Sequence, residues 1–259
     1  MIKITGKVLE GKKLGRTIGF PTANVEIPLN SPFTKGGMGG LEDGTYKINI
    51  VISGKIFAGV GAYLNDKKLF EAHIFDFNEN IYGKEIEVYL LEKIRENKKF
   101  ENLDELKQQI QKDVEFTKQN QFNVLTFGTF DVFHEGHKYF LNEAKKFGDK
   151  LITIVATDKN VEKIKGFKTH FDQQTRKKEI EKSGISDLIL VGSENNPLNW
   201  LLLYKPRYIC LGYDQRGFSE KLPNFIKENS LKTEIVRIPS FKPEIYKSSI
   251  LKKYKLQKT

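Results

Sequence analysis

The stretch Thr126–Leu141, TFGTFDVFHEGHKYFL, sets the architecture of the second half of this chain. It begins inside an apolar run at 124–127 that predicts a short buried strand, and apolar residues at helical spacing then predict a helix over 136–147. Gly128 and Thr129 leave the strand in a tight turn. A strand that enters a helix through such a turn directs free N–H groups and the positive end of the helix dipole to one place. The stretch therefore predicts a phosphate site.

Two histidines stand between that strand and helix, in the run His134-Glu135-Gly136-His137. Imidazoles in this position add hydrogen-bond donors for the charge that builds up on a phosphoryl group during transfer. The structural alternative is a turn whose histidines only cap the helix. Two histidines three residues apart occur often by chance, but not within the longer pattern GTFDxxHxGH. The pattern favours a catalytic site.

The rest of the second half alternates strands with helices. Apolar runs predict strands at 124–127, 150–156, 187–191, 207–212 and 234–238, and amphipathic runs predict helices at 136–147, 173–183, 197–204, 217–229 and 247–256. This alternation indicates a parallel, doubly wound α/β sheet of the Rossmann-like kind, in which ligands bind beyond the carboxyl ends of the strands. Four residues stand just past predicted strand ends: His134, Asp158, Gly212 and Arg237. We expect them to converge.

The first half is a succession of short strands. Strand-like runs occur at 2–8, 24–27, 45–52, 55–62, 69–77 and 85–91, separated by polar or glycine-containing breaks, which predicts an antiparallel barrel. A helix follows, capped by Asn102 with Glu105 answering the cap. We expect its apolar face to pack on the barrel through Leu103, Leu106, Ile110 and Val114. The polar break at 119–123 predicts two domains, 1–120 and 121–259.

Composition limits the class of protein. A hydrophobic content of 39% is enough for packed cores, and the single cysteine excludes a disulfide framework or a cysteine-based zinc site. No signal peptide or membrane-length apolar run is visible, which predicts a soluble, cytoplasmic protein. The net charge of +10 is concentrated in the second half: residues 1–120 hold 18 basic and 17 acidic residues, and residues 121–259 hold 25 and 16. Polyanionic ligands, nucleic acid or a lysine-rich coding bias would each explain it.

The informative run of the first half is Gly6–Asn24, GKVLEGKKLGRTIGFPTAN. Its glycines permit close approach of the backbone to a ligand. Thr22 and Asn24 lie two apart on a strand and so face the same side, where their oxygens suit Mg²⁺. The plainer alternative is a glycine-rich hairpin with a polar end.

This run resembles the signature of the riboflavin kinase family, which ends in GFPTAN. Three later blocks agree with the same family, namely Gly44-Thr45-Tyr46, EAHIFDFNENIYG at 71–83, and Arg95 to Phe100 with the helix that follows. The resemblance implies that Glu71 is the general base and that Thr22 and Asn24 hold Mg²⁺. It further implies that the ATP phosphates are bordered by Gly11, Lys12, Gly15, Arg16 and Gly19.

The second half resembles the HxGH nucleotidyltransferase superfamily and, within it, the archaeal-type FAD synthases. Three blocks carry the closer likeness: ATDKNVEKIKG at 156–166, LGYDQ at 211–215 and YKSSI at 246–250. The resemblance implies catalytic roles for His134 and His137. It implies that the ATP of this domain is bound by Thr129, Phe130, His134, Gly136, His137, Lys165, Arg176, Gly212, Asp214, Ser248 and Ser249.

Together the two resemblances imply a bifunctional enzyme. Riboflavin would be phosphorylated to FMN in the first domain, and FMN would be adenylylated to FAD in the second, with ATP and a divalent cation such as Mg²⁺ in both steps. We expect riboflavin, FMN and ATP as partners, no nucleic acid or membrane, and a monomer or small homo-oligomer. One alternative keeps the kinase but makes the second domain a cytidylyltransferase of a polyol or sugar phosphate. Another is an RNA-binding or regulatory protein that retains both folds without the chemistry.

Overall fold

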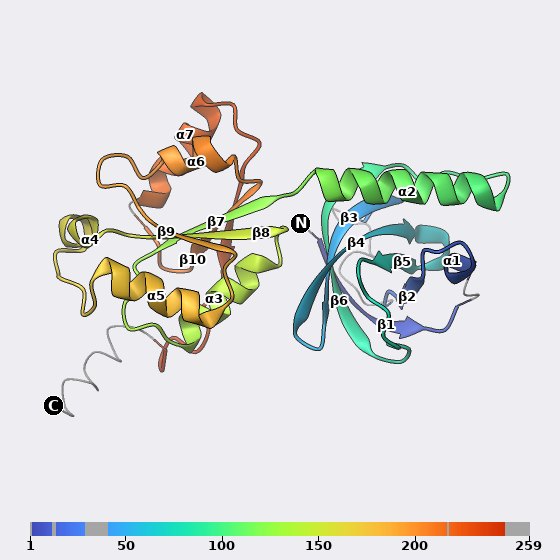
Figure 1. The fold of residues 1–259 in the computed structure, drawn as a ribbon, viewed down its shortest axis with the longest axis horizontal. Coiled ribbons are helices and arrows are strands. Elements are labelled where there is room, and N and C mark those ends of the chain that lie inside the picture. Colours follow the sequence, from blue (N-terminus) through green and yellow to red (C-terminus); the bar gives the residue numbers. More distant parts are fainter. Residues whose placement is uncertain (1, 12–13, 29–40, 217, 247–259) are drawn as a thin grey trace. The chain divides into compact units, whose positions relative to one another are not determined.

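The computed structural model describes residues 2–11, 14–28, 41–216 and 218–246. Contacts within the chain divide it into two compact units, Met1–Gln121 and Phe122–Thr259, which we call the barrel unit and the sheet unit (Figure 1). The predicted helix at 247–256 lies outside the described residues, as do Lys12, Ser248 and Ser249. Each unit is described by itself.

The barrel unit contains a closed, antiparallel barrel in the strand order β1-β2-β5-β4-β3-β6, as the succession of short strands predicts. Alternation of buried and exposed residues, clearest along β1, turns one face of each strand into a common core. Ser53 and Gly54 both adopt positive φ and form the tight hairpin between β3 and β4. The strands are β1 (Ile2–Leu9), β2 (Thr22–Glu26), β3 (Gly44–Ile52), β4 (Lys55–Leu64), β5 (Leu69–Ile74) and β6 (Glu85–Arg95).

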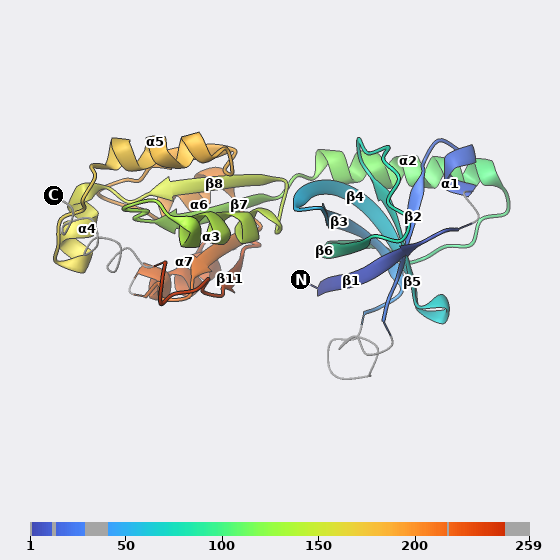
Figure 2. The same cartoon turned by 90° about the horizontal axis from the view of Figure 1, so that it is seen from below.

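Two short helical turns, α1 (Leu14–Thr17) and η1 (Asn65–Lys67), connect strands of the barrel. The long helix α2 (Leu103–Gln119) lies along the outside, against β4 (Figure 2). The predicted cap is confirmed, because the Asn102 side chain accepts a hydrogen bond from the Glu105 N–H.

The predicted buried face of α2 is partly wrong. Leu103 is exposed, and the residues of α2 that are fully buried are Asp113 and Thr117. A buried cation fixes the end of the helix: Lys47 Nζ donates to the carbonyl oxygens of Thr117, at 3.1 Å, and Asn120, at 2.7 Å. Such bonds satisfy carbonyls that the last turn of a helix leaves open. The helix is therefore held by buried polar bonds as well as by apolar packing.

The sheet unit contains a five-stranded parallel sheet in the order β11-β10-β7-β8-β9, which confirms the predicted α/β class. The chain proceeds from β7 outward to β9 and then returns to the other side of β7 for β10 and β11. This reversal creates a switch point between β7 and β10, where open α/β sheets bind ligands. The strands are β7 (Asn123–Gly128), β8 (Lys150–Val155), β9 (Leu188–Val191), β10 (Tyr208–Gly212) and β11 (Glu234–Ile238).

Helices cover both faces of this sheet. One face packs on α3 and α5 and the other on α6 and α7 (Figure 1), and a buried apolar cluster fills each interface. The helices are α3 (Glu135–Lys145), α4 (Asp158–Lys165), α5 (Gln173–Ser183), α6 (Asn199–Tyr204), the short turn η2 (Phe218–Lys221) and α7 (Leu222–Glu228).

Local signals account for most of these boundaries. Asp172 caps α5 through the N–H groups of Gln174 and Thr175, and Gly184 ends the helix in left-handed backbone, both as predicted. Helix α4 was not predicted, although Thr157 caps it. Cys210 is buried within β10, and burial raises the pKa of its thiol. Among the described residues, no helix combines the length and apolarity that crossing a bilayer requires.

Candidate functional sites

Strands β2 and β5 bring the predicted catalytic residues of the barrel unit together. Their antiparallel register sets Asn24 opposite Glu71 and Thr22 opposite His73, so all four side chains lie on one face of the pair. The residues between them point into the barrel core, as buried Ala23 and Ala72 do. The four polar side chains therefore lie on the outer surface of the barrel wall.

A cavity of about 220 Å³ opens over this surface. Thr22 and Glu71 line one side of it, and Leu106 and Ile110 of α2 line the other. Apolar side chains thus face a carboxylate across the cavity, which suits a ligand with a flat apolar part and a hydroxyl group.

An ion pair ties α2 to the barrel beside this cavity. Arg95 donates to both carboxylate oxygens of Asp113, at 3.0 Å from Nε and 2.6 Å from Nη2, and both residues line the cavity. Gln109 Nε2 adds a bond of 2.9 Å to the same carboxylate. A bidentate pair of this kind fixes distance and orientation together. The helical wall of the cavity is therefore rigidly placed.

A second cavity, of about 400 Å³, lies on the other side of Thr22. It is lined by Arg16, Pro21 and the segment 77–82, which includes Glu79 and Asn80. Because Thr22 lines both cavities, it marks the place where a ligand in one would meet a ligand in the other.

The glycine loop of the first half packs directly on Thr22 and Asn24. A Cβ atom at Gly11 would lie 1.7 Å from the Asn24 amide nitrogen, and one at Gly15 would lie 2.3 Å from the Phe20 carbonyl oxygen and 3.2 Å from Thr22 Oγ1. These glycines therefore serve the folding of the loop itself. Gly19 is needed for its backbone, which has a φ of 86°.

In the sheet unit, the turn between β7 and α3 contains two non-glycine residues with positive φ. Phe130 and Val132 both have a φ of 52°, in the left-handed region that non-glycine residues avoid. The intervening Asp131 is buried, and its carboxylate accepts hydrogen bonds from the N–H groups of His170, at 2.8 Å, and Phe171, at 3.1 Å. Strained backbone persists where its surroundings impose it. Here a neighbouring segment of the sheet unit imposes it.

Arg176 holds the same turn in place through hydrogen bonds. Its side chain is wholly buried and donates to the carbonyl oxygens of Phe171, Thr129 and Ala156, and to the Asp158 carboxylate at 2.6 Å. It does not line the cavity described below. Its hydrogen bonds therefore indicate a positioning role for Arg176, and the expected contact between Arg176 and ATP stays a prediction. Asp158, predicted at a strand end, is one of its partners.

The two histidines lie face to face at the start of α3. Their ring centroids are 3.8 Å apart with 18° between the planes. Burial lowers the pKa of His137 to about 3, with further lowering by His134 and Lys165, and burial also lowers the pKa of His134. Both imidazoles are therefore neutral at neutral pH, and each can donate a single hydrogen bond.

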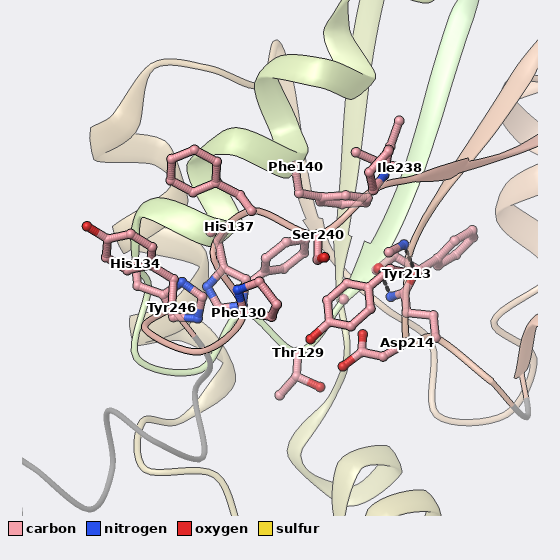
Figure 3. A pocket seen from close by; sticks show the side chains of 18 of the residues that line it. Thr129, Phe130, His134, His137, Phe140, Tyr213, Asp214, Ile238, Ser240 and Tyr246 are labelled. Carbon is pink, nitrogen blue, oxygen red and sulfur yellow. Dashed lines mark hydrogen bonds between the residues drawn. The ribbon is translucent and has the colours of Figure 1, made fainter.

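The histidines line a cavity of about 360 Å³ at the switch point of the sheet (Figure 3). In that view the His134, His137 and Tyr246 rings gather at one side of the cavity, and Tyr213 and Asp214 lie across it. The structure brings most predicted ATP-binding residues together here: Thr129, Phe130, His134, Gly136, His137, Lys165, Gly212 and Asp214. Ser248 and Ser249 lie outside the described residues.

Two features of this cavity were not predicted, namely the Gln215 bridge and the segment that follows β11. Gln215 Nε2 donates to the Phe127 carbonyl oxygen while its Oε1 accepts from the Gly212 N–H, so it joins the ends of β7 and β10. Arg237, which was predicted at the strand end, does not line the cavity but donates to the carbonyl oxygens of Gly212 and Gln215 beside it. Pro239, Ser240, Phe241, Pro243 and Tyr246 form one wall of the cavity. Local sequence patterns do not reveal these contacts, because the partners are up to 88 residues apart.

Comparison with known proteins agrees with the two units. Residues 1–121 match the riboflavin kinase family model, and residues 125–254 match the cytidylyltransferase-like family model. A bifunctional riboflavin kinase/FMN adenylyltransferase of Haemophilus influenzae is 43% identical over 45% of this chain and 37% of its own length. The present chain thus matches well under half of that relative.

Two smaller relatives are matched over most of their length. An FAD synthase of Methanosarcina barkeri is 40% identical over 45% of this chain and 82% of its own. One of Picrophilus torridus is 32% identical over 50% of this chain and 93% of its own. Because the second family model covers half of the chain, this protein belongs to the cytidylyltransferase-like family, with a match to the riboflavin kinase model before it.

Proposed function

We propose that this chain converts riboflavin to FMN in its barrel unit and FMN to FAD in its sheet unit. The observation that carries the proposal is the pair of separate sites: Glu71 shares a cavity with Thr22 on the barrel, and His134 shares another with His137 at the switch point of the sheet. The relatives named above, a bifunctional enzyme and two FAD synthases, support the same pair of reactions.

In the kinase step, the terminal ribityl hydroxyl of riboflavin attacks the γ-phosphorus of ATP. Glu71 accepts the hydroxyl proton, the bond to the β-phosphate oxygen breaks, and ADP leaves. We assign riboflavin to the cavity that holds Glu71, between the barrel and α2. We assign ATP to the cavity that holds Arg16, so that the γ-phosphate reaches the hydroxyl beside Thr22.

A divalent cation fits the barrel site only when it binds together with ATP. Thr22 and Asn24 offer two neutral oxygens on one face of β2, and the described residues contain no group of three or more His, Cys, Asp or Glu that could hold a metal. Mg²⁺ commonly takes one or two protein oxygens and completes its shell with phosphates and water. Thr22 and Asn24 would hold it, and it would neutralise charge on the phosphates.

In the adenylyl transfer step, an FMN phosphate oxygen attacks the α-phosphorus of ATP, the bond to the β-phosphate breaks, and pyrophosphate leaves. The attacking phosphate is already an anion, so no proton acceptor is needed. His134 and His137 each donate one hydrogen bond to the negatively charged oxygens of the phosphoryl group, and Lys165 and the start of α3 add positive potential. Holding the two substrates in line supplies the rest of the rate enhancement.

Incubating the purified protein with riboflavin, ATP and Mg²⁺ tests the proposal. Chromatography over time should show FMN rising first and FAD following. Omitting riboflavin and supplying FMN should give FAD directly. Failure to form either product would contradict the proposal, and formation of FMN alone would restrict it to the barrel unit.

A second candidate for the sheet unit is a cytidylyltransferase of a polyol or sugar phosphate, favoured by the description of the matching family model. Measuring ³²P incorporation from α-labelled ATP and from α-labelled CTP, with FMN as acceptor, separates the two. We expect label from ATP in a flavin product. Label from CTP, or label only when a polyol phosphate replaces FMN, would favour the alternative. An RNA-binding protein without activity would incorporate neither.

A further inference from the structure

One wall of the sheet-unit cavity is the segment that follows β11. Pro239, Ser240, Phe241, Pro243 and Tyr246 all line the cavity. The segment is folded by a turn in which the Lys242 carbonyl oxygen accepts hydrogen bonds of 2.9 Å from the N–H groups of Ile245 and Tyr246. Lys242 itself has a φ of 42°, so the turn is held in a conformation that a free chain would avoid.

This wall is joined to α3 by a series of stacked rings, which we call the ring ladder: Tyr139, Phe241, Tyr246, His134 and His137. The successive centroid distances are 4.9, 5.7, 6.5 and 3.8 Å, and each pair of planes lies within 21° of parallel. Offset stacks at these distances are attractive and orient the rings. The ladder begins on α3, crosses the wall and returns to the start of α3 at the two histidines.

A second contact presses the wall against the histidine motif. A Cβ atom on Gly136 would lie 3.1 Å from the Tyr246 carbonyl oxygen and 3.0 Å from the His134 ring. The backbone of the wall therefore lies directly against Gly136. A side chain here would have to displace the Tyr246 backbone or the His134 ring by a few tenths of an ångström.

We propose that Tyr246 is a positioning residue for adenylyl transfer, because its ring fixes the plane of the His134 imidazole. This inference rests on the proposed function of the sheet unit. A neutral imidazole has one N–H to donate, so its contribution depends on where the ring points. Stacking between Tyr246 on one side and His137 on the other restricts rotation of the His134 ring. The aromatic face of Tyr246, and not its hydroxyl, carries this role.

Three variants test the inference in the full chain. Tyr246→Ala removes the ring, Tyr246→Phe keeps it without the hydroxyl, and Ile245→Ala alters the exposed neighbour in the same turn. Rates of FAD formation from FMN are measured at saturating ATP, together with the KM for ATP. The riboflavin kinase rate of the same molecules serves as the internal control.

For Tyr246→Ala we expect kcat for FAD formation to fall about 10- to 100-fold, the cost of a misdirected catalytic group, while the KM for ATP changes by less than about threefold. Tyr246→Phe should recover kcat to within about threefold of the original protein. Ile245→Ala should match the original protein, and all three should keep the kinase rate. An unchanged kcat in Tyr246→Ala, or a loss that Tyr246→Phe does not recover, would overturn the inference.

A spectroscopic measurement makes the test independent of the proposed reaction. The imidazole proton signals of His134 should shift in Tyr246→Ala, which loses the ring current of the tyrosine, and stay in place in Ile245→Ala. If the original protein forms no FAD, the proposed function fails, and unchanged His134 signals would separately overturn the positioning role. Should Tyr246→Ala not fold, Tyr246→Leu keeps the bulk without an aromatic face and is measured in its place.

Discussion

The two candidate sites of the chain are formed by different kinds of backbone turn. In the barrel unit, Gly11 and Gly15 let a loop close over Thr22 and Asn24 where any Cβ atom would collide. In the sheet unit, the turn before His134 uses ordinary residues, Phe130 and Val132, in left-handed backbone. Glycine lowers the local cost of a sharp turn but raises the entropy lost on folding. Strained non-glycine residues need support from elsewhere in the unit.

The difference decides where each site is vulnerable. The barrel site depends on the absence of side chains within its own loop. The sheet site depends on distant parts of the same unit, because the Asp131 carboxylate in the turn accepts hydrogen bonds from the backbone at 170–171 and Arg176 donates to the Thr129 carbonyl oxygen. A substitution far from the sheet site can therefore disable it, whereas the barrel site is most sensitive within the loop itself.

The largest effect should come from Glu71→Gln. Removing a general base costs about 10²- to 10⁴-fold in rate, and we expect riboflavin phosphorylation to fall within that range. Formation of FAD from supplied FMN should be unchanged, since Glu71 belongs to the barrel unit. The mirror variant, His137→Ala, should lower FAD formation alone. Chromatographic rates of both steps measure the pattern. A kinase rate unaffected by Glu71→Gln would show that another group takes the proton.

Gly15→Ala tests whether the kinase step needs a glycine at this position of the loop. The added Cβ would meet the Phe20 carbonyl oxygen, a backbone atom that cannot swing away, so the loop must shift. A displacement of about 1 Å can cost about 100-fold in rate, which is the fall we expect for the kinase step. The FAD-forming rate of the same preparation is the control. Full kinase activity would mean that the loop relaxes without moving its phosphate contacts.

Arg176→Lys tests the supported turn. A lysine cannot reach the three carbonyl oxygens and the carboxylate that the guanidinium joins. We expect the sheet unit to lose about 1–3 kcal/mol of unfolding free energy, because the lysine leaves buried carbonyl oxygens without a hydrogen bond, as measured by urea denaturation. Lys177→Met is the matched control: its pairing with Glu181 is partly exposed and should be worth under about 1 kcal/mol. Equal losses in the two variants would refute the supporting role.

The smallest expected effect is that of His137 ionisation on the rate of FAD formation. Because the pKa of His137 is lowered to about 3, its ring is neutral in solution throughout pH 7–9, a range in which the phosphate of FMN is largely dianionic. The rate of FAD formation should show no ionisation of His137 in that range. If the reaction needed a cationic His137, the rate would fall as pH rises. A pH–rate profile at saturating ATP and FMN distinguishes the two.

Sequence patterns predicted those parts of the molecule that depend on local chemistry. The caps at Asn102 and Asp172 and the terminating Gly184 were correct, because each acts within a few residues of itself. The barrel and the parallel sheet followed from strand spacing. The buried face of α2 was partly missed because its centre is polar: Asp113 is matched by Arg95, which a search for apolar periodicity ignores.

The candidate sites were predicted less completely than the fold. Motif residues such as Thr22, Glu71, His134 and His137 do line cavities, but Arg176 is a support beneath the site. A buried arginine bound to backbone carbonyls cannot be told from an exposed ligand by its neighbours in sequence. The ring ladder joins residues about a hundred positions apart and has no local signature.

The single cysteine has a practical consequence. Cys210 is enclosed in the middle of β10, and burial keeps its thiol protonated at neutral pH. Maleimide dyes react with exposed thiolates, so they should pass this residue by while the protein stays folded. A cysteine introduced by Lys112→Cys, on the exposed side of α2, would then be labelled selectively, and Cys210 would not have to be removed first.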